Sequence, residues 1–179
     1  MGVALDVRPA DIDETPLPGE PPREYVERIA LAKVTAIASA LPGAWVLAAD
    51  TTVTIDGEIL AKAESDAEAA AMLEQLAGRT HEVITAFAIA GPGGARARES
   101  VTTEVEFTAL SEREIAAYVA SGEWRGKAGA YAIQGIAAGF VRAVRGSVTN
   151  VIGLPLAEVI AALRALGAPG ADIARGQAV

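Results

Sequence analysis

A short apolar run that stops at a carboxylate constrains the fold of this chain more than any other feature. Residues 44–49 read Ala-Trp-Val-Leu-Ala-Ala, and Asp50 follows them directly. A run of this length is typical of a strand that is buried on both faces of a parallel or mixed sheet. Ligands of open α/β sheets collect beyond the carboxyl ends of such strands, so Asp50 is a candidate metal ligand or general base at the mouth of a cleft. The alternative is an aspartate that caps a helix or forms a turn before a hairpin.

The composition narrows the class of protein. The 179 residues suit one domain, and 51% of them are hydrophobic, which is enough for a sizeable core. The absence of cysteine excludes disulfides and thiolate metal sites, and a single histidine, His81, excludes a histidine-rich zinc site. The net charge of −8 argues against extended binding of nucleic acid, although a local lysine pair could still bind a small anion. Because neither a membrane span nor a secretory signal is present, we expect a cytoplasmic protein with no membrane or nucleic-acid partner.

The order of the expected elements indicates an α/β fold, because strands and helices alternate along the chain. Capping boxes at Ser65 and Ser111 mark two helix starts, and Asp56-Gly57 marks a hairpin. The strands are expected over residues 2–8, 44–50, 51–55, 58–60, 82–90, 98–108 and 140–145, and the helices over 22–41, 66–77, 112–120 and 155–166. We expect a single domain over residues 1–167 and a flexible tail over residues 168–179.

The helix expected from Pro22 carries a lysine on its apolar stripe. Lys33 lies four residues after Ile29 and four before Ile37, so it projects from the middle of the buried face. Lysines are almost never buried without a partner. The Lys33 ammonium therefore either snorkels to solvent at the edge of the stripe or points into the cleft. In the cleft it would be matched by the acidic loop over residues 11–15 or by a phosphate.

Three further segments place polar groups where the chain is expected to bend. Lys62 follows the hairpin and precedes a helix, whereas residues 127–135 are rich in small side chains that let the backbone approach a ligand. Residues 149–155 lead into the final helix, whose N-terminus can attract an anion. None of these segments matches a P-loop, a dinucleotide fingerprint or a Gly-x-Ser-x-Gly elbow.

Taken together and in this order, the segments resemble the Maf family of nucleoside triphosphate pyrophosphatases. The resemblance extends from the first residues to about Gly167. The matching pieces are residues 11–16, Lys33, residues 49–51, 56–60, 78–83, 127–135 and 150–155. The resemblance implies an elongated mixed sheet with helices on both sides, two lobes around a deep cleft, and a homodimer. It also implies hydrolysis of a nucleoside triphosphate to the monophosphate plus pyrophosphate, with a divalent cation, Mg²⁺ or Mn²⁺.

The same resemblance implies roles for single residues. Asp50 corresponds to the proton acceptor of the family, and the pocket is lined by Glu14, Lys33, Lys62 and Gln134. The chemistry agrees, because attack of water on a phosphoryl group needs a base and cations that neutralise the phosphate oxygens. Glu14 and Asp50 supply hard oxygen ligands for magnesium, and the two lysines supply point charges for phosphate.

The expected substrate follows from two positions in the resemblance. Thr51 and Gln134 match the family members that act on dTTP and UTP rather than on 7-methyl-GTP. A glutamine amide offers a donor and an acceptor, which can pair with the O4 and N3–H edge of uracil or thymine. The alternative for Gln134 is a hydrogen bond that caps its own loop.

Two departures from the family pattern keep other hypotheses open. Family members begin with a strand and a helix that carry a Ser-x-Arg-Arg motif, and this chain starts after that segment, so we expect an N-terminally truncated domain. The Gly-Lys-Pro of the family stands here as Ala61-Lys62-Ala63, which predicts a less rigid loop. One alternative is a non-catalytic protein that binds nucleotides or regulates cell division, and another is a metal-dependent hydrolase of a non-nucleotide phosphate. His81 is expected to have a structural role.

Overall fold

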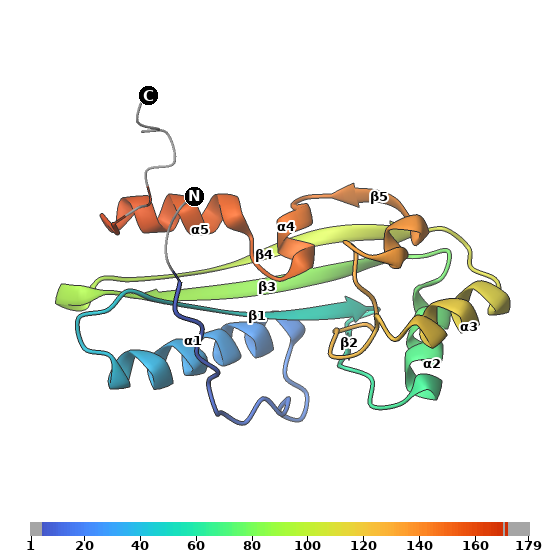
Figure 1. Cartoon of the computed structure of the whole chain (residues 1–179), viewed down its shortest axis with the longest axis horizontal. Coiled ribbons are helices and arrows are strands. Elements are labelled where there is room, and N and C mark those ends of the chain that lie inside the picture. The colour runs from blue at the N-terminus through green and yellow to red at the C-terminus, as the bar shows by residue number, and fades with distance from the viewer. Residues whose placement is uncertain (1–4, 170, 172–179) are drawn as a thin grey trace.

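The computed structural model describes residues 5–169 and 171, which form a long sheet with helices on both faces (Figure 1). The helices are α1 (Pro22–Ala40), α2 (Asp66–Leu76), α3 (Glu112–Ser121), α4 (Val148–Ile152) and α5 (Leu156–Ala165). The strands are β1 (Val46–Ile55), β2 (Glu58–Leu60), β3 (Thr80–Ala90), β4 (Arg96–Phe107) and β5 (Val141–Arg145). Two 3₁₀ turns, η1 (Pro92–Gly94) and η2 (Ile136–Phe140), complete the described elements. The expected α/β class with helices on both sides of the sheet is confirmed, whereas the described strand pairs are antiparallel rather than mixed.

The described strands form one five-stranded sheet in the order β2-β1-β3-β4-β5. Each neighbouring pair is antiparallel, and the three long strands β1, β3 and β4 run along most of the molecule (Figure 1). Helix α1 covers one face, whereas α4 and α5 lie over the other, and α2 and α3 gather at one end. The site is therefore built on a stiff antiparallel platform.

Alternation along β3 explains why helices cover both faces. Successive side chains of a strand point to opposite faces of the sheet. In β3, the side chains on both faces are apolar. Ala86 and Ala88 pack with Val34 of α1, whereas Phe87 and Ile89 pack on the side of α5. Each fully buried Val, Ile or Phe side chain contributes about 1.5–3 kcal/mol, and each buried alanine methyl contributes less. A further core at the end of the molecule joins α2 and α3 to β4 and η2.

The strand that carries Asp50 differs from the expectation in two ways. It does not end at Asp50 but continues to Ile55, so Asp50 lies in mid-strand. It pairs with β3 over residues 46–54 but with β2 only over residues 53–55. Within the described chain, no strand lies along the other edge of residues 46–52, and Leu47 is 39% exposed. Because Leu47 is exposed, the apolar run is not buried on both faces of the sheet. Because β2 does not reach residues 46–52, Asp50 lies on a stretch of β1 with one unpaired edge.

The N-terminal strand expected over residues 2–8 is wrong where it can be checked. Residues 5–8 have no regular structure, and residues 2–4 lie outside the described ones. Leu5 and Val7 are 82% and 88% exposed. An isolated strand without a partner cannot satisfy its backbone hydrogen bonds, so the apolar alternation of this segment is not sufficient to form one.

The helix boundaries were predicted more accurately than the short turns. Helix α1 ends one residue before the expected Leu41, and the predicted capping box at Ser111 and Glu114 is present in α3. Helix α4 was not expected, because five residues are too few to give a periodic signal.

In the segment expected to be a flexible tail, Ala171 accepts a hydrogen bond from Arg164. No helix in the described residues is long and apolar enough to cross a membrane.

Candidate active site

Three charged side chains from separate segments meet beside β1. The Nζ atom of Lys33 on α1 lies 2.8 Å from Asp50 Oδ1 and 2.7 Å from Glu14 Oε1. The Lys33 side chain is 18% exposed and that of Asp50 is 10% exposed. Because α1 packs on the face of the sheet that holds Asp50, a lysine in its apolar stripe meets the strand before it can reach solvent. Of the two alternatives for Lys33, the structure shows the paired cation.

Glu14 connects this pair to a second lysine. Its Oε2 atom lies 3.4 Å from Lys62 Nζ, while its Oε1 atom faces Lys33. Lys62 follows β2, and its backbone forms an isolated antiparallel bridge with Ala128. Four residues that the sequence predicted from four separate segments therefore form one alternating series of charges, in the order Asp50, Lys33, Glu14, Lys62.

Burial and pairing shift the pKa values of this cluster in different directions. Burial raises the pKa of Asp50 above its ordinary value, and the neighbouring Lys33 offsets only part of that rise. The hydrogen bond from Lys33 holds the pKa of Glu14 below its ordinary value. Burial acts to lower the pKa of Lys33, but its bonds to the two carboxylates outweigh burial and raise it. Asp50 is therefore the better proton acceptor, and Glu14 is the more firmly ionised carboxylate.

Two α1 residues that sequence reasoning missed hold the Glu14 loop in place. The Tyr25 hydroxyl donates a hydrogen bond of 3.0 Å to the Glu14 carbonyl oxygen. Arg28 donates to both carboxylate oxygens of Glu20 at 2.6 and 2.7 Å and to the Thr15 carbonyl oxygen at 3.1 Å. Residues three apart on a helix are surface neighbours, so the Tyr25–Arg28 spacing was the available signal.

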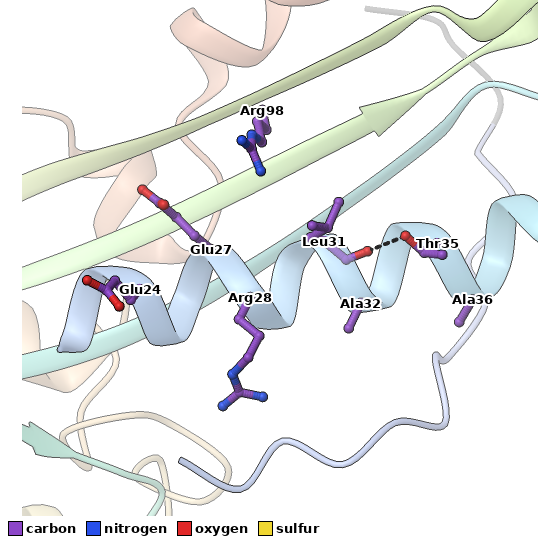
Figure 2. A pocket seen from close by; sticks show the side chains of 8 residues that line it. All are labelled: Glu24, Glu27, Arg28, Leu31, Ala32, Thr35, Ala36 and Arg98. Atoms are coloured by element: carbon purple, nitrogen blue, oxygen red, sulfur yellow. Dashed lines mark hydrogen bonds between the residues drawn. The ribbon is translucent and has the colours of Figure 1, made fainter. Parts of the chain in front are cut away.

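One large surface hollow is not near this chemistry. A groove of about 670 Å³ runs along the outside of α1, and none of the predicted site residues line it (Figure 2). Figure 2 shows Glu27 and Arg98 on one side of the helix and Arg28 pointing to the other. Most of its surface is apolar, although Glu24, Glu27, Arg28 and Arg98 lie along it. Without convergent polar groups, this groove is a poor candidate for a catalytic site.

A narrower cleft of about 240 Å³ follows the open edge of β1 beside the charged cluster. Its lining residues come from β1, β3, the segment after β2, residues 126–131, and the end of α4 with Gly153 after it. They include Asp50, Thr51, Lys62 and Lys127. The cleft exists because β2 is too short to cover this part of the β1 edge.

The small residues of segment 126–131 allow close packing against β1. A Cβ atom at Gly129 would lie 2.9 Å from the Val53 side chain, and Gly129 has a φ of +65°. Its amide donates to the Leu60 carbonyl oxygen at 3.0 Å. Ala130 is fully buried and has a φ of 56°, a backbone conformation that residues other than glycine rarely adopt. This backbone packs closely against the strand that carries Asp50, whereas its expected approach to a ligand stays a prediction.

A buried polar network fixes α4 as the opposite wall of the cleft. Thr51 Oγ1 lies 2.8 Å from Thr85 Oγ1, and the Thr85 hydroxyl donates to the Asn150 carbonyl oxygen at 2.9 Å. The fully buried Asn150 amide nitrogen donates to the Val83 carbonyl oxygen at 3.0 Å. The network sets the position of Thr51 relative to α4, whose last residues line the cleft.

Two other residues singled out by the sequence lie away from the charged cluster. Gln134 is exposed and is not one of the residues that line the cleft, so the structure does not bring it to Asp50. His81 is 2% exposed and packs edge-on against Phe107 and Tyr131, with its Nε2 atom 2.8 Å from the Tyr131 hydroxyl. The structural role expected for His81 is confirmed.

The carboxylates of the cluster fit a hard divalent cation. Asp50 Oδ2 is buried and has no hydrogen-bond partner among the described residues, and Glu14 Oε2 makes only the 3.4 Å contact with Lys62. Magnesium usually takes one or two carboxylates and completes its shell with water and phosphate. In the described part of the chain, no three His, Cys, Asp or Glu side chains converge as a metal cage. The donor set therefore suits a cation that arrives with a phosphorylated ligand.

Comparison with known proteins agrees with the chemistry of the cleft, in which the largely buried carboxylate of Asp50 and two lysines line one cavity. Residues 1–166 match the Maf-like protein family. A protein of Anaeromyxobacter dehalogenans (strain 2CP-C), named dTTP/UTP pyrophosphatase, is 52% identical over 172 residues, which cover 94% of this chain and 87% of that protein. Proteins of the same name from Caulobacter vibrioides and Rhodospirillum rubrum are 49% and 53% identical, over 93% and 96% of this chain and 87% and 83% of their own lengths. With this similarity along nearly its whole length, the chain belongs to the Maf-like protein family.

Proposed function

We propose that this protein hydrolyses dTTP and UTP to the nucleoside monophosphate and pyrophosphate. The observation that carries the proposal is the series Asp50, Lys33, Glu14 and Lys62 beside the cleft, with a buried Asp50 oxygen that has no partner among the described residues. The relatives named above are dTTP/UTP pyrophosphatases, which supports the same substrate class.

Asp50 is the proposed general base. Lys33 occupies Oδ1 at 2.8 Å and so fixes the carboxylate, while Oδ2 is left to accept a proton from water. The water oxygen forms a bond to the α-phosphorus, the bond from that phosphorus to the bridging oxygen of the β-phosphate breaks, and pyrophosphate leaves. The raised pKa of Asp50 strengthens it as a base relative to an aspartate in water.

The remaining charges bind the triphosphate and the metal. We propose that Lys33 and Lys62 contact phosphate oxygens, each as a point charge. Glu14 and Asp50 would hold Mg²⁺ or Mn²⁺ through carboxylate oxygens, with Oδ2 of Asp50 kept as the proton acceptor. When bound, such a cation neutralises negative charge on the phosphate oxygens.

The preference for a pyrimidine base is proposed to depend on Thr51 and Gln134. Thr51 lines the cleft and is held by Thr85, which supports its role. Gln134 is exposed, so its role requires that substrate extends from the cleft toward residues 133–135. If Gln134 pairs with the base, Gln134→Ala should narrow the preference for UTP over 7-methyl-GTP. Without the Gln134 amide, binding of 7-methyl-GTP would no longer leave a polar group of the protein unpaired.

We also propose a homodimer in the cytoplasm, where nucleoside triphosphates are present. The support is the family resemblance in the sequence, and sedimentation equilibrium of the purified protein tests the dimer.

Pyrophosphate release from a panel of triphosphates, with and without Mg²⁺, tests the proposal. We expect dTTP and UTP to be hydrolysed much faster than ATP, GTP and 7-methyl-GTP, and only when a divalent cation is present. Asp50→Asn should lower turnover at least about a hundredfold while the fold is retained, because the base is lost. Near-normal turnover in folded Asp50→Asn would refute the base assignment. Tight nucleotide binding by the wild type without hydrolysis would favour the non-catalytic alternative.

A further inference from the structure

The three lysines of this chain converge on one site. Lys33, Lys62 and Lys127 are the only lysines in the sequence, and the other twelve of its 15 cationic side chains are arginines. Lys33 contacts Asp50, whereas Lys62 and Lys127 line the cleft beside it. In a protein of net charge −8, every lysine thus either lines this cavity or contacts the Asp50 carboxylate that does. An ammonium is a compact point charge on a flexible stem and suits phosphate binding.

The charge balance of the cluster singles out Lys127. Glu14 and Asp50 carry two negative charges, and Lys33 and Lys62 carry two positive ones, so these four side chains cancel. Lys127 has no carboxylate within 4.0 Å among the described residues. It is therefore the cation whose charge is free to attract an anion into the cleft.

The segment that carries Lys127 is held firmly in position. The Lys127 amide donates to the Trp124 carbonyl oxygen at 3.1 Å, and the next residue, Ala128, forms the bridge with Lys62. Gly129 packs against β1, so the segment cannot move away from the cleft without breaking these contacts. A fixed backbone reduces the conformational entropy that an exposed lysine loses when it binds a ligand.

We propose that Lys127 is a further substrate-binding residue, which contacts the phosphates that leave as pyrophosphate rather than the phosphate that remains on the nucleoside. This inference rests on the proposed pyrophosphatase function for the identity of the substrate. Lys33 touches the base Asp50 and so belongs at the phosphorus that is attacked, whereas Lys127 lies on a separate segment that lines the cleft. An extended triphosphate that is attacked beside Asp50 can then place its outer phosphates against the segment that carries Lys127.

Arg125 provides a matched control in the same segment. It lies two residues before Lys127, is 66% exposed, pairs with Asp66 at 3.2 Å, and stacks on Trp124 with its Cζ atom 4.5 Å from the ring centroid. Arg125→Met removes one positive charge from the same segment without changing the cleft wall. A difference between Lys127→Met and Arg125→Met therefore measures a local contact rather than the net charge of the protein.

The test compares binding of pyrophosphate, dTMP and α,β-imido-dUTP to the wild type and the variants by calorimetry, in the presence of Mg²⁺. Lys127→Met should weaken pyrophosphate and imido-dUTP binding about tenfold, in the range for a hydrogen bond to a charged group. Its affinity for dTMP should change less than about twofold. Lys127→Arg should restore most of the affinity because the charge is retained, and Arg125→Met should match the wild type.

Three outcomes would overturn the inference. They are unchanged pyrophosphate affinity in folded Lys127→Met, an equal loss in Arg125→Met, and an equal loss for dTMP. Because the assay measures binding, it gives a result even if no triphosphate is hydrolysed. If the wild type hydrolyses no triphosphate, the proposed function is refuted. The binding affinities of the Lys127 and Arg125 variants decide the role of Lys127 separately.

Discussion

At the scale of single residues, the site depends on the opposed pKa shifts of two carboxylates that share one lysine. Burial raises the pKa of Asp50, and the bond from Lys33 lowers that of Glu14. A base must be ionised to accept a proton, so activity should be lost as the pH falls through the raised pKa of Asp50. Lys33 favours the ionised form of Asp50 and thus extends the active range toward lower pH.

The first residue-scale prediction is that Lys33→Met moves the acidic limb of the kcat/KM profile to higher pH. Without the ammonium, burial and the nearby Glu14 act on Asp50 unopposed by Lys33, and both raise its pKa. Lys62→Met should move the limb less, because Lys62 has the weaker influence on Asp50. The measurement is kcat/KM for dTTP across the acidic range. A shift toward lower pH in Lys33→Met would contradict the assigned pairing.

At the scale of elements, the loop before α1 is positioned by the helix that follows it. Tyr25 and Arg28 bind the loop backbone, and the Arg28 guanidinium lies over the Tyr25 ring at 5.7 Å. The Glu20 carboxylate, whose pKa the Arg28 hydrogen bonds hold at about 2, also accepts from the Leu17 amide. The loop can therefore present the Glu14 side chain to both lysines without regular structure of its own.

The element-scale prediction is that Arg28→Met lowers kcat/KM about tenfold through Glu14. Small misplacements of a binding group can have effects of this size or larger. In a Glu14→Gln background, Arg28→Met should have almost no further effect, since residues that act through one another are not additive. Arg23 lies on the same helix but donates hydrogen bonds to Ser100 and Thr102 of β4. Arg23→Met is therefore the control, and its kcat/KM should stay near the wild-type value. Fully additive losses in the double variant would refute the positioning role.

At the scale of the whole molecule, burial of one titratable group couples stability to pH. His81 lies in the core that joins the sheet to the end containing α2 and α3, and burial lowers its pKa to about 4. Between that value and the ordinary value of about 6.5, the unfolded chain binds a proton that the folded protein does not. Stability should therefore fall as the pH drops through this window, with no further loss from His81 below it.

The whole-molecule prediction concerns the slope of unfolding free energy against pH. For wild type, the His81 contribution to the decrease between pH 6.5 and 4 is at most about 3 kcal/mol. His81→Gln keeps a hydrogen-bonding group beside Tyr131 but does not titrate, so its slope over the upper part of this window should be clearly smaller. Urea denaturation of both proteins at several pH values gives the comparison. Parallel slopes would show that other groups control the acid sensitivity.

The sequence alone predicted most of the elements, and it predicted four side chains that the structure brings together. Periodicity, capping residues and turn signals are local, which is why α1, α3 and the β1–β2 hairpin could be recognised from short stretches. Lys33 was identifiable because a lysine in an apolar stripe needs a partner. Only the tertiary structure showed that the partners are Asp50 and Glu14, since this pairing depends on the packing of α1 across the sheet.

The tertiary structure also decided which surface becomes the cleft. The run before Asp50 has the composition of a fully buried strand, yet its burial depends on how far β2 extends beside it, and β2 covers only residues 53–55. The same applies to Lys127 and Gln134, which lie seven residues apart in one small-residue segment: Lys127 lines the cleft, whereas Gln134 does not. Local sequence sets the conformations available to each segment, but contacts between distant segments determine which side chains share a cavity.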